Sequence, residues 1–190
     1  MAWQKRTCRF LHTHWVFHQE GDESCGPSCG LMIAQRLRGT RMNAEDSYVG
    51  MEGYGMHKQV GTYQPNQRPT DGDEMARYLK MMLGKTTQYV NPRLASQVKS
   101  GVLANLNANP SKPVVMGVMW LGAHGKTENR GGHWICVDRV TQFMGSTYVC
   151  VCDPGDGHVH PIKWNDLGSL VYKPQYSTHG GQLDDYIELT

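Results

Sequence analysis

The spacing of hydrophobic positions changes about halfway along the chain. Before residue 110, apolar side chains recur three or four positions apart, which predicts helices. After residue 113 they form continuous or alternating runs, which predict strands. Helices followed by strands are typical of an α+β domain with an antiparallel sheet.

Three helices are expected in the first part. The first spans 26–37, where Pro27 suits the first turn and Gly39 ends the helix. The second spans 71–83, with acidic residues in its first turn and apolar residues at i, i+3, i+4, i+7 and i+8. The third extends from the Asn-Pro pair at 91–92 to just before the next proline.

Four strands are expected in the second part. Residues 114–120 form an unbroken apolar run, which is typical of a strand covered on both faces. The other strands span 133–140, 147–153 and 158–162, and glycine-containing turns join them into hairpins.

Between the first two helices, residues 40–68 are polar and rich in glycine and tyrosine. Their length favours a functional covering loop over a simple connector. No repeat, low-complexity tract or linker divides the sequence, so we expect one domain over residues 1–190.

Charge and composition exclude several function classes. The 19 Lys and Arg against 17 Asp and Glu leave a net charge of +2, which disfavours a nucleic-acid partner. The longest apolar stretch, 114–123, is about half the ~20 residues that span a bilayer, so no membrane anchor is expected. The N-terminus lacks the apolar run of a signal peptide, which predicts a cytoplasmic protein at synthesis. In a reducing compartment, the six cysteines are expected to be core residues, ligands or nucleophiles.

Cys25 is the candidate nucleophile. It lies immediately before the first predicted helix, where the positive end of the helix dipole favours a thiolate. A backbone N–H at the helix start can donate to an oxyanion, and the carboxamide of Gln19 can supply a second donor. The alternative is that Cys25 is an ordinary buried cysteine of the core with no catalytic role.

A nucleophilic cysteine needs a base and a group that orients the base. His133 follows two glycines, and Asp153 ends the next predicted strand. If these strands form a hairpin centred on residue 143, His133 and Asp153 lie directly opposite each other. His158 is the main rival for the base and His124 a more distant one.

Other cysteines and histidines have alternative interpretations. Cys29 lies one helical turn after Cys25 and is expected to be a small core residue. The pairs Cys150/Cys152 and His158/His160 suggest zinc, but a symmetric turn at 154–157 would direct the two pairs to opposite sides. A zinc site built from these four residues is therefore not expected.

These motifs together resemble the papain-like cysteine peptidases. They are most similar to the branch that contains the leader peptidases of bacteriocin-exporting transporters and their stand-alone relatives. The matching segments are Gln19…Cys25-Gly26-Pro27, Gly132-His133-Trp134-Ile135 and Val151-Cys152-Asp153-Pro154-Gly155. The resemblance implies Cys25 as nucleophile, Gln19 as oxyanion donor, His133 as base and Asp153 as its orienter, with Trp134 beside the cleft. Ser28-Cys29-Gly30 and the long 40–70 loop depart from the family pattern.

The resemblance implies a papain-like α+β fold and a cysteine peptidase that acts on a protein or peptide, with no cofactor and no metal. The same triad could instead serve an acyl transferase or amidase. A non-catalytic binding module is disfavoured because all four site residues are present. Small relatives of this kind include toxins delivered into competing bacteria and restrained by an immunity protein, although a housekeeping peptidase fits equally well.

Overall fold

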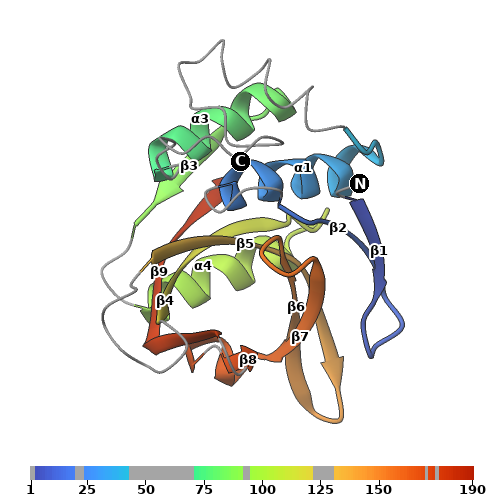
Figure 1. Cartoon of the computed structure of the whole chain (residues 1–190), viewed down its shortest axis with the longest axis vertical. Helices are drawn as coiled ribbons and strands as arrows, with labels where there is room; N and C mark the ends of the chain where they lie inside the picture. The colour runs from blue at the N-terminus through green and yellow to red at the C-terminus, as the bar shows by residue number, and fades with distance from the viewer. Residues whose placement is uncertain are drawn as a thin grey trace.

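The computed structural model describes residues 3–19, 24–42, 71–91, 95–121, 131–169, 171–173 and 176–190 (Figure 1). These residues contain the helices α1 (Cys25–Arg38), α3 (Gly72–Leu83) and α4 (Ala95–Asn107), and a short 3-10 helix, Trp164–Ser169. The strands are β1 (Trp3–Thr7), β2 (Thr13–Phe17), β3 (Thr87–Val90), β4 (Val114–Leu121), β5 (Gly131–Phe143), β6 (Ser146–Asp153), β7 (His158–Lys163), β8 (Val171–Lys173) and β9 (Tyr176–Leu189).

Seven of these strands form one antiparallel sheet. Its order is β3-β9-β4-β5-β6-β7, and β8 pairs with β9 outside this path. The strands β1 and β2 form a separate two-stranded hairpin. The α+β class with an antiparallel sheet is therefore confirmed, although helix and strand are less segregated along the chain than the sequence predicts.

Helices cover both faces of the large sheet. Alternating residues of β4 show this: Val115 packs in one core cluster with α1 and α3, whereas Val114 and Met116 pack in a second cluster with α4. In Figure 1, α1 and α3 lie on the same side of the sheet. The expectation that residues 114–120 form a strand covered on both faces is confirmed by this alternation at 114–118.

The predicted helix ends agree closely with the structure. Gly39 adopts a left-handed conformation with φ of 75° and its N–H donates to the Gln35 carbonyl, which ends α1. Asp71 caps α3 by accepting a hydrogen bond from the Glu74 N–H, while the Glu74 side chain accepts one from the Asp71 N–H. The third predicted helix is found as α4, and its expected start at 91–94 lies largely outside the described residues.

The helices α1 and α3 pack closely where Gly30 meets Tyr78. Tyr78 is fully buried, and its hydroxyl donates to the Pro27 carbonyl over 3.4 Å. A side chain at Gly30 would overlap the Tyr78 ring, so glycine permits this close approach. The contact holds the start of α1 against the rest of the core.

Several strands have no counterpart in the sequence prediction. The strands β1 and β2 are interrupted by charged residues and histidines, and β9 contains a Gly-Gly pair and two adjacent aspartates. None of these segments shows a clean two-residue period, so tertiary pairing decides their conformation. The predicted covering loop at 40–68 falls mostly on residues 43–70, which lie outside the described residues.

The register of β6 and β7 is as predicted. Cys152 pairs with Val159 and Asp153 with His158 across the turn at 154–157. This pairing separates the cysteine and histidine pairs, as the sequence-based argument against their shared zinc site expects.

The predicted register of β5 and β6 is wrong. The turn lies at Met144 and Gly145, and a bulge at Asp138 absorbs one extra residue of β5. Beyond the bulge, Cys136 pairs with Cys152, so His133 and Asp153 are not directly opposite. They still share one face because the displacement is two residues.

The β1–β2 hairpin is tied to the turn that follows β6. The Gln19 N–H donates to the Pro154 carbonyl over 2.9 Å, and the Arg6 side chain donates to the Gly157 carbonyl over 2.8 Å. Within the part of the chain that the structure describes, no helix is both long and apolar enough to cross a membrane.

Candidate active site

Cys25 is the first residue of α1, one position further into the helix than the sequence predicts. Its side chain is buried, with 6% of the residue exposed. The backbone N–H of Trp134 donates to the Cys25 sulfur over 3.5 Å. The start of α1 is thereby joined to β5 at the residue that follows His133.

His133 and Asp153 form a hydrogen-bonded ion pair. Nε2 of His133 lies 2.8 Å from Oδ1 of Asp153, whose side chain is only 1% exposed. The Gly155 N–H donates to the same carboxylate oxygen over 2.7 Å. The Asp-Pro-Gly turn therefore holds the Asp153 carboxylate in place, and this carboxylate in turn orients the His133 imidazole.

The surroundings of His133 favour its protonated form. Burial acts to lower the pKa of His133, but hydrogen bonds to Asp153 and Cys25 and their charges outweigh it and raise the pKa to about 10. Burial likewise acts to raise the pKa of Asp153, but the hydrogen bond and charge of His133 lower it. An imidazolium held between a sulfur and a carboxylate is the electrostatic state that these three residues support.

Gln19 lies two residues after β2, and its backbone hydrogen bond to Pro154 places it beside the turn that follows Asp153. The structure thus brings the backbone of Gln19 to the same end of the sheet as Asp153. Cys25 follows at the start of the next described segment.

The rival residues do not share the contacts of His133. His158 is the ladder partner of Asp153, but its side chain is 54% exposed and lies beside Asp156. Cys29 is fully buried in the core, where burial raises the pKa of its thiol well above the ordinary value. His124 lies outside the described residues.

The sequence analysis does not predict the contacts that Trp134 and Gly155 make at the site. The backbone N–H of Trp134 contacts the sulfur, and Gly155 approaches both His133 and Asp153 so closely that its Cβ would lie 3.4 Å from the imidazole Cε1. The Asp-Pro-Gly sequence signals a tight turn, and its Asx-type hydrogen bond could have been expected from that signal.

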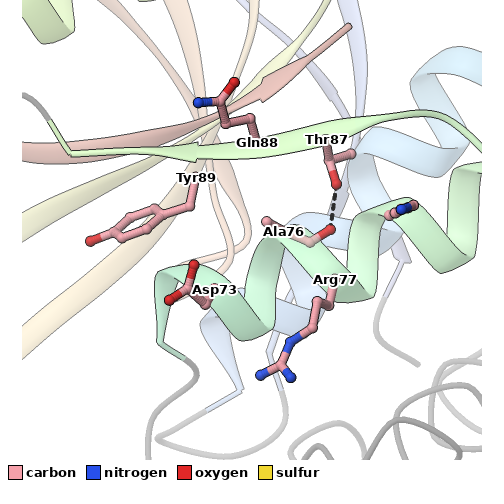
Figure 2. A pocket seen from close by; sticks show the side chains of 7 residues that line it. Asp73, Ala76, Arg77, Thr87, Gln88 and Tyr89 are labelled. Carbon is pink, nitrogen blue, oxygen red and sulfur yellow. Dashed lines mark hydrogen bonds between the residues drawn. The ribbon is translucent and has the colours of Figure 1, made fainter.

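A pocket of about 560 Å³ lies between α3 and β3 (Figure 2). Its lining is made of Asp73, Ala76, Arg77, Lys80, Thr87, Gln88 and Tyr89. It includes none of the four candidate site residues.

Comparisons with known proteins give no evidence about the activity of this chain, so a functional assignment depends on the geometry of the site. No family model and no curated protein matches the chain. Among solved structures, it is similar to UfSP from C. elegans, with 15% identity and a TM-score of 0.42 over 98% of this chain and 34% of that chain. The chain thus spans about a third of that protein's length, and a likeness of this size carries no argument about activity.

Proposed function

We propose that the protein is a papain-like cysteine peptidase that hydrolyses peptide bonds of a protein or peptide. One observation carries the proposal: the buried Asp153 holds the His133 ring at 2.8 Å, and the N–H of the next residue, Trp134, contacts the sulfur of the buried Cys25 at the start of α1. Nucleophile, base and orienter in this order are the arrangement that thiol-based acyl transfer needs.

Proton transfer follows from the geometry of the ring. Because Nε2 of His133 is held by Asp153, Nδ1 is the nitrogen that exchanges a proton with the Cys25 sulfur. The Cys25 thiolate attacks the carbonyl carbon of the scissile bond, and a tetrahedral oxyanion forms. The His133 imidazolium then donates its proton to the leaving amine, and an acyl-enzyme remains on the sulfur.

Two donors are assigned to the oxyanion. The Cys25 N–H belongs to the first turn of α1, where backbone N–H groups lack partners within the helix. The Gln19 carboxamide is the second donor, supported by the backbone bond that anchors Gln19 beside the Asp153 turn. Water activated by His133 finally hydrolyses the acyl-enzyme and restores the thiol.

Identification of new protein N-termini tests the proposal. Wild-type protein and the Cys25→Ala variant are each mixed with a bacterial lysate, with and without an added primary amine. New N-termini that appear only with wild-type protein support a peptidase. Amine conjugates without new N-termini would instead support the acyl-transfer alternative, and no difference between the two proteins would remove the proposed activity.

The resemblance to the bacteriocin leader-peptidase branch and its toxin relatives supports a further part of the proposal, a role as a delivered effector. Expression inside bacteria tests it without any knowledge of the substrate. Growth arrest by wild-type protein but not by Cys25→Ala would support this role. Normal growth with active, folded wild-type protein would favour a housekeeping peptidase.

A further inference from the structure

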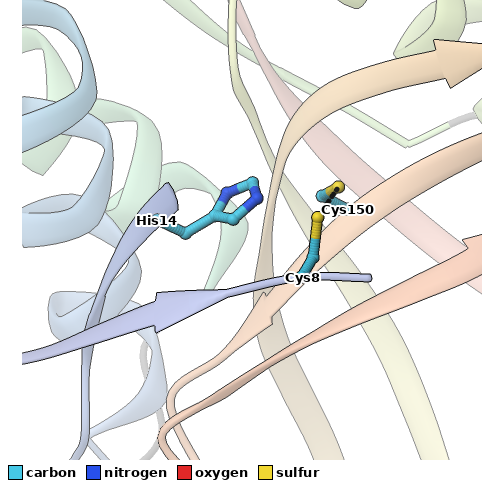
Figure 3. Close-up of side chains that lie close together, drawn as sticks. All are labelled: Cys8, His14 and Cys150. Carbon is cyan, nitrogen blue, oxygen red and sulfur yellow. Dashed lines mark hydrogen bonds between the residues drawn. The ribbon is translucent and has the colours of Figure 1, made fainter. Parts of the chain in front are cut away.

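A second group of reactive side chains lies between the β1–β2 hairpin and the large sheet. Cys8 follows β1, His14 belongs to β2, and Cys150 belongs to β6. One ligand atom from each lies within 4.8 Å of the other two, and all three residues are buried. Figure 3 shows the His14 ring and the Cys8 sulfur turned toward Cys150.

The separation of the two sulfurs fits a bridging metal ion. Sγ of Cys8 lies 3.9 Å from Sγ of Cys150. A disulfide requires about 2.05 Å, so the two atoms are not bonded. Two thiolates at about 2.3 Å from a tetrahedral zinc ion lie about 3.8 Å apart, which is close to the observed spacing.

His14 is oriented as a metal ligand would be. Its Nδ1 lies 2.7 Å from Oδ2 of the buried Asp138, which assigns the proton to Nδ1 and leaves the lone pair on Nε2. That Nε2 atom is buried and has no nitrogen or oxygen partner among the described residues. Metal-bound histidines characteristically donate their other ring N–H to a carboxylate in this way.

The chemistry of the three side chains also suits a metal ion. Two thiolates and an imidazole form a ligand set that favours zinc over the hard cations.

We propose that Cys8, His14 and Cys150 bind a zinc ion that fastens the β1–β2 hairpin to β6. The three side chains leave one position of a tetrahedral zinc ion for a further ligand, such as water. Because the cluster is buried, zinc enters as the chain folds and has a structural role.

The proposed zinc ion would join two strands, β2 and β6, that lead to the candidate active site. The strand β2 leads to Gln19, and β6 ends at Asp153. The zinc site itself does not depend on the proposed peptidase activity, because none of its three ligands takes part in that chemistry. The two proposals can therefore fail separately.

Metal content of the purified full chain tests the zinc site. Protein produced with zinc in the medium is freed of loose metal by gel filtration, and bound zinc is measured by mass spectrometry. We expect one zinc per chain in wild-type protein and in the controls Cys25→Ala and Cys136→Ala, which alter buried cysteines outside the cluster. In Cys8→Ala and Cys150→Ala we expect most of the zinc to be lost. Cobalt substitution should give a thiolate-to-metal absorption band in wild-type protein that weakens in both variants.

Asp138→Asn keeps the test informative if the cysteine variants fail to fold. Loss of the carboxylate behind His14 should weaken zinc binding by about 10–100-fold in competition with a chelator. The proposal is overturned if wild-type protein contains no zinc, or if Cys8→Ala retains it in full. A disulfide between Cys8 and Cys150, detected by mass under non-reducing conditions, would likewise replace the metal with a covalent link.

Discussion

His133 and Asp153 are diagonal neighbours on one face of the sheet, and their side chains meet at 2.8 Å. Beyond the bulge in β5, the ladder pairs Cys136 with Cys152, so its continuation would bring Asp153 opposite Ile135. His133 is two residues further along the same face. An imidazole and a carboxylate can span this diagonal.

Replacement of Cys25 separates the proposed nucleophile from its neighbour in α1. We expect Cys25→Ala to abolish turnover of a general protein substrate, because the Cys25 sulfur meets β5 at the residue that follows His133. Cys29→Ala is the matched control and should retain most of the activity, since Cys29 is buried in the core. The reverse outcome would move the nucleophile to Cys29.

Replacement of Gln19 tests the second oxyanion donor. We expect Gln19→Ala to lower kcat by roughly 10²-fold, the usual effect of removing one such donor, with little change in KM. Far-ultraviolet circular dichroism and thermal unfolding of the same sample should match wild-type protein. A near-normal kcat would remove Gln19 from the mechanism.

The protonation of His133 should depend on Asp153. The pKa of His133 is raised from 6.5 to about 10, with burial opposing the shift and Asp153 and Cys25 supplying it. In Asp153→Asn the carboxylate charge is lost, so we expect the pKa of His133 to fall markedly. Nitrogen chemical shifts of the ring, measured between pH 5 and pH 11, would follow the change in both proteins.

The same shift predicts how stability depends on pH. Because the folded-state pKa is raised, the protonated ring stabilises the folded chain fully below about pH 6.5, and this contribution is lost as the pH rises toward 10. The alkaline loss of stability in urea titrations should therefore be smaller in Asp153→Asn. An identical pH dependence in the two proteins would contradict the assigned coupling.

The contact between α1 and α3 predicts a stability effect that involves none of the proposed catalytic groups. Gly30→Ala places a methyl group into the Tyr78 ring and should destabilise the fold by roughly 1–3 kcal/mol in urea unfolding. In a Tyr78→Ala background the ring is gone, so the same substitution should cost much less. An equal cost in both backgrounds would show that the Gly30 backbone, and not the ring, sets the penalty.

Local signals in the sequence were sufficient for the helices and for the hairpin between β6 and β7. Gly39 and Asp71 end and begin their helices through short-range hydrogen bonds, which the residue types alone indicate. The register of β5 and β6 depends on a bulge at Asp138, for which no local pattern gives a signal. The shared face of His133 and Asp153 was therefore predicted, but the two-residue offset between them was not.

The Cys8 cluster shows a different limit. Its three members come from two hairpins separated by more than a hundred residues, and no spacing motif links Cys8 and His14 to Cys150. Spacing can reveal only cysteine and histidine pairs that are close in sequence, such as Cys150/Cys152 and His158/His160, and the sequence analysis did not expect these to share a zinc ion. Tertiary pairing of the N-terminal hairpin with β6 brings Cys8 and His14 beside Cys150 instead.

Deletion of Asp138, the extra residue in β5, would affect the contact with His14 but not the shared face of His133 and Asp153. Removal of Asp138 would leave Arg139 opposite Cys150 and Val137 opposite Val151 in an uninterrupted ladder, so His133 and Asp153 would keep their shared face. The same excision would take away the carboxylate bonded to His14. A chain without Asp138 would thus keep the two candidate catalytic residues on one face and lose the carboxylate that holds His14.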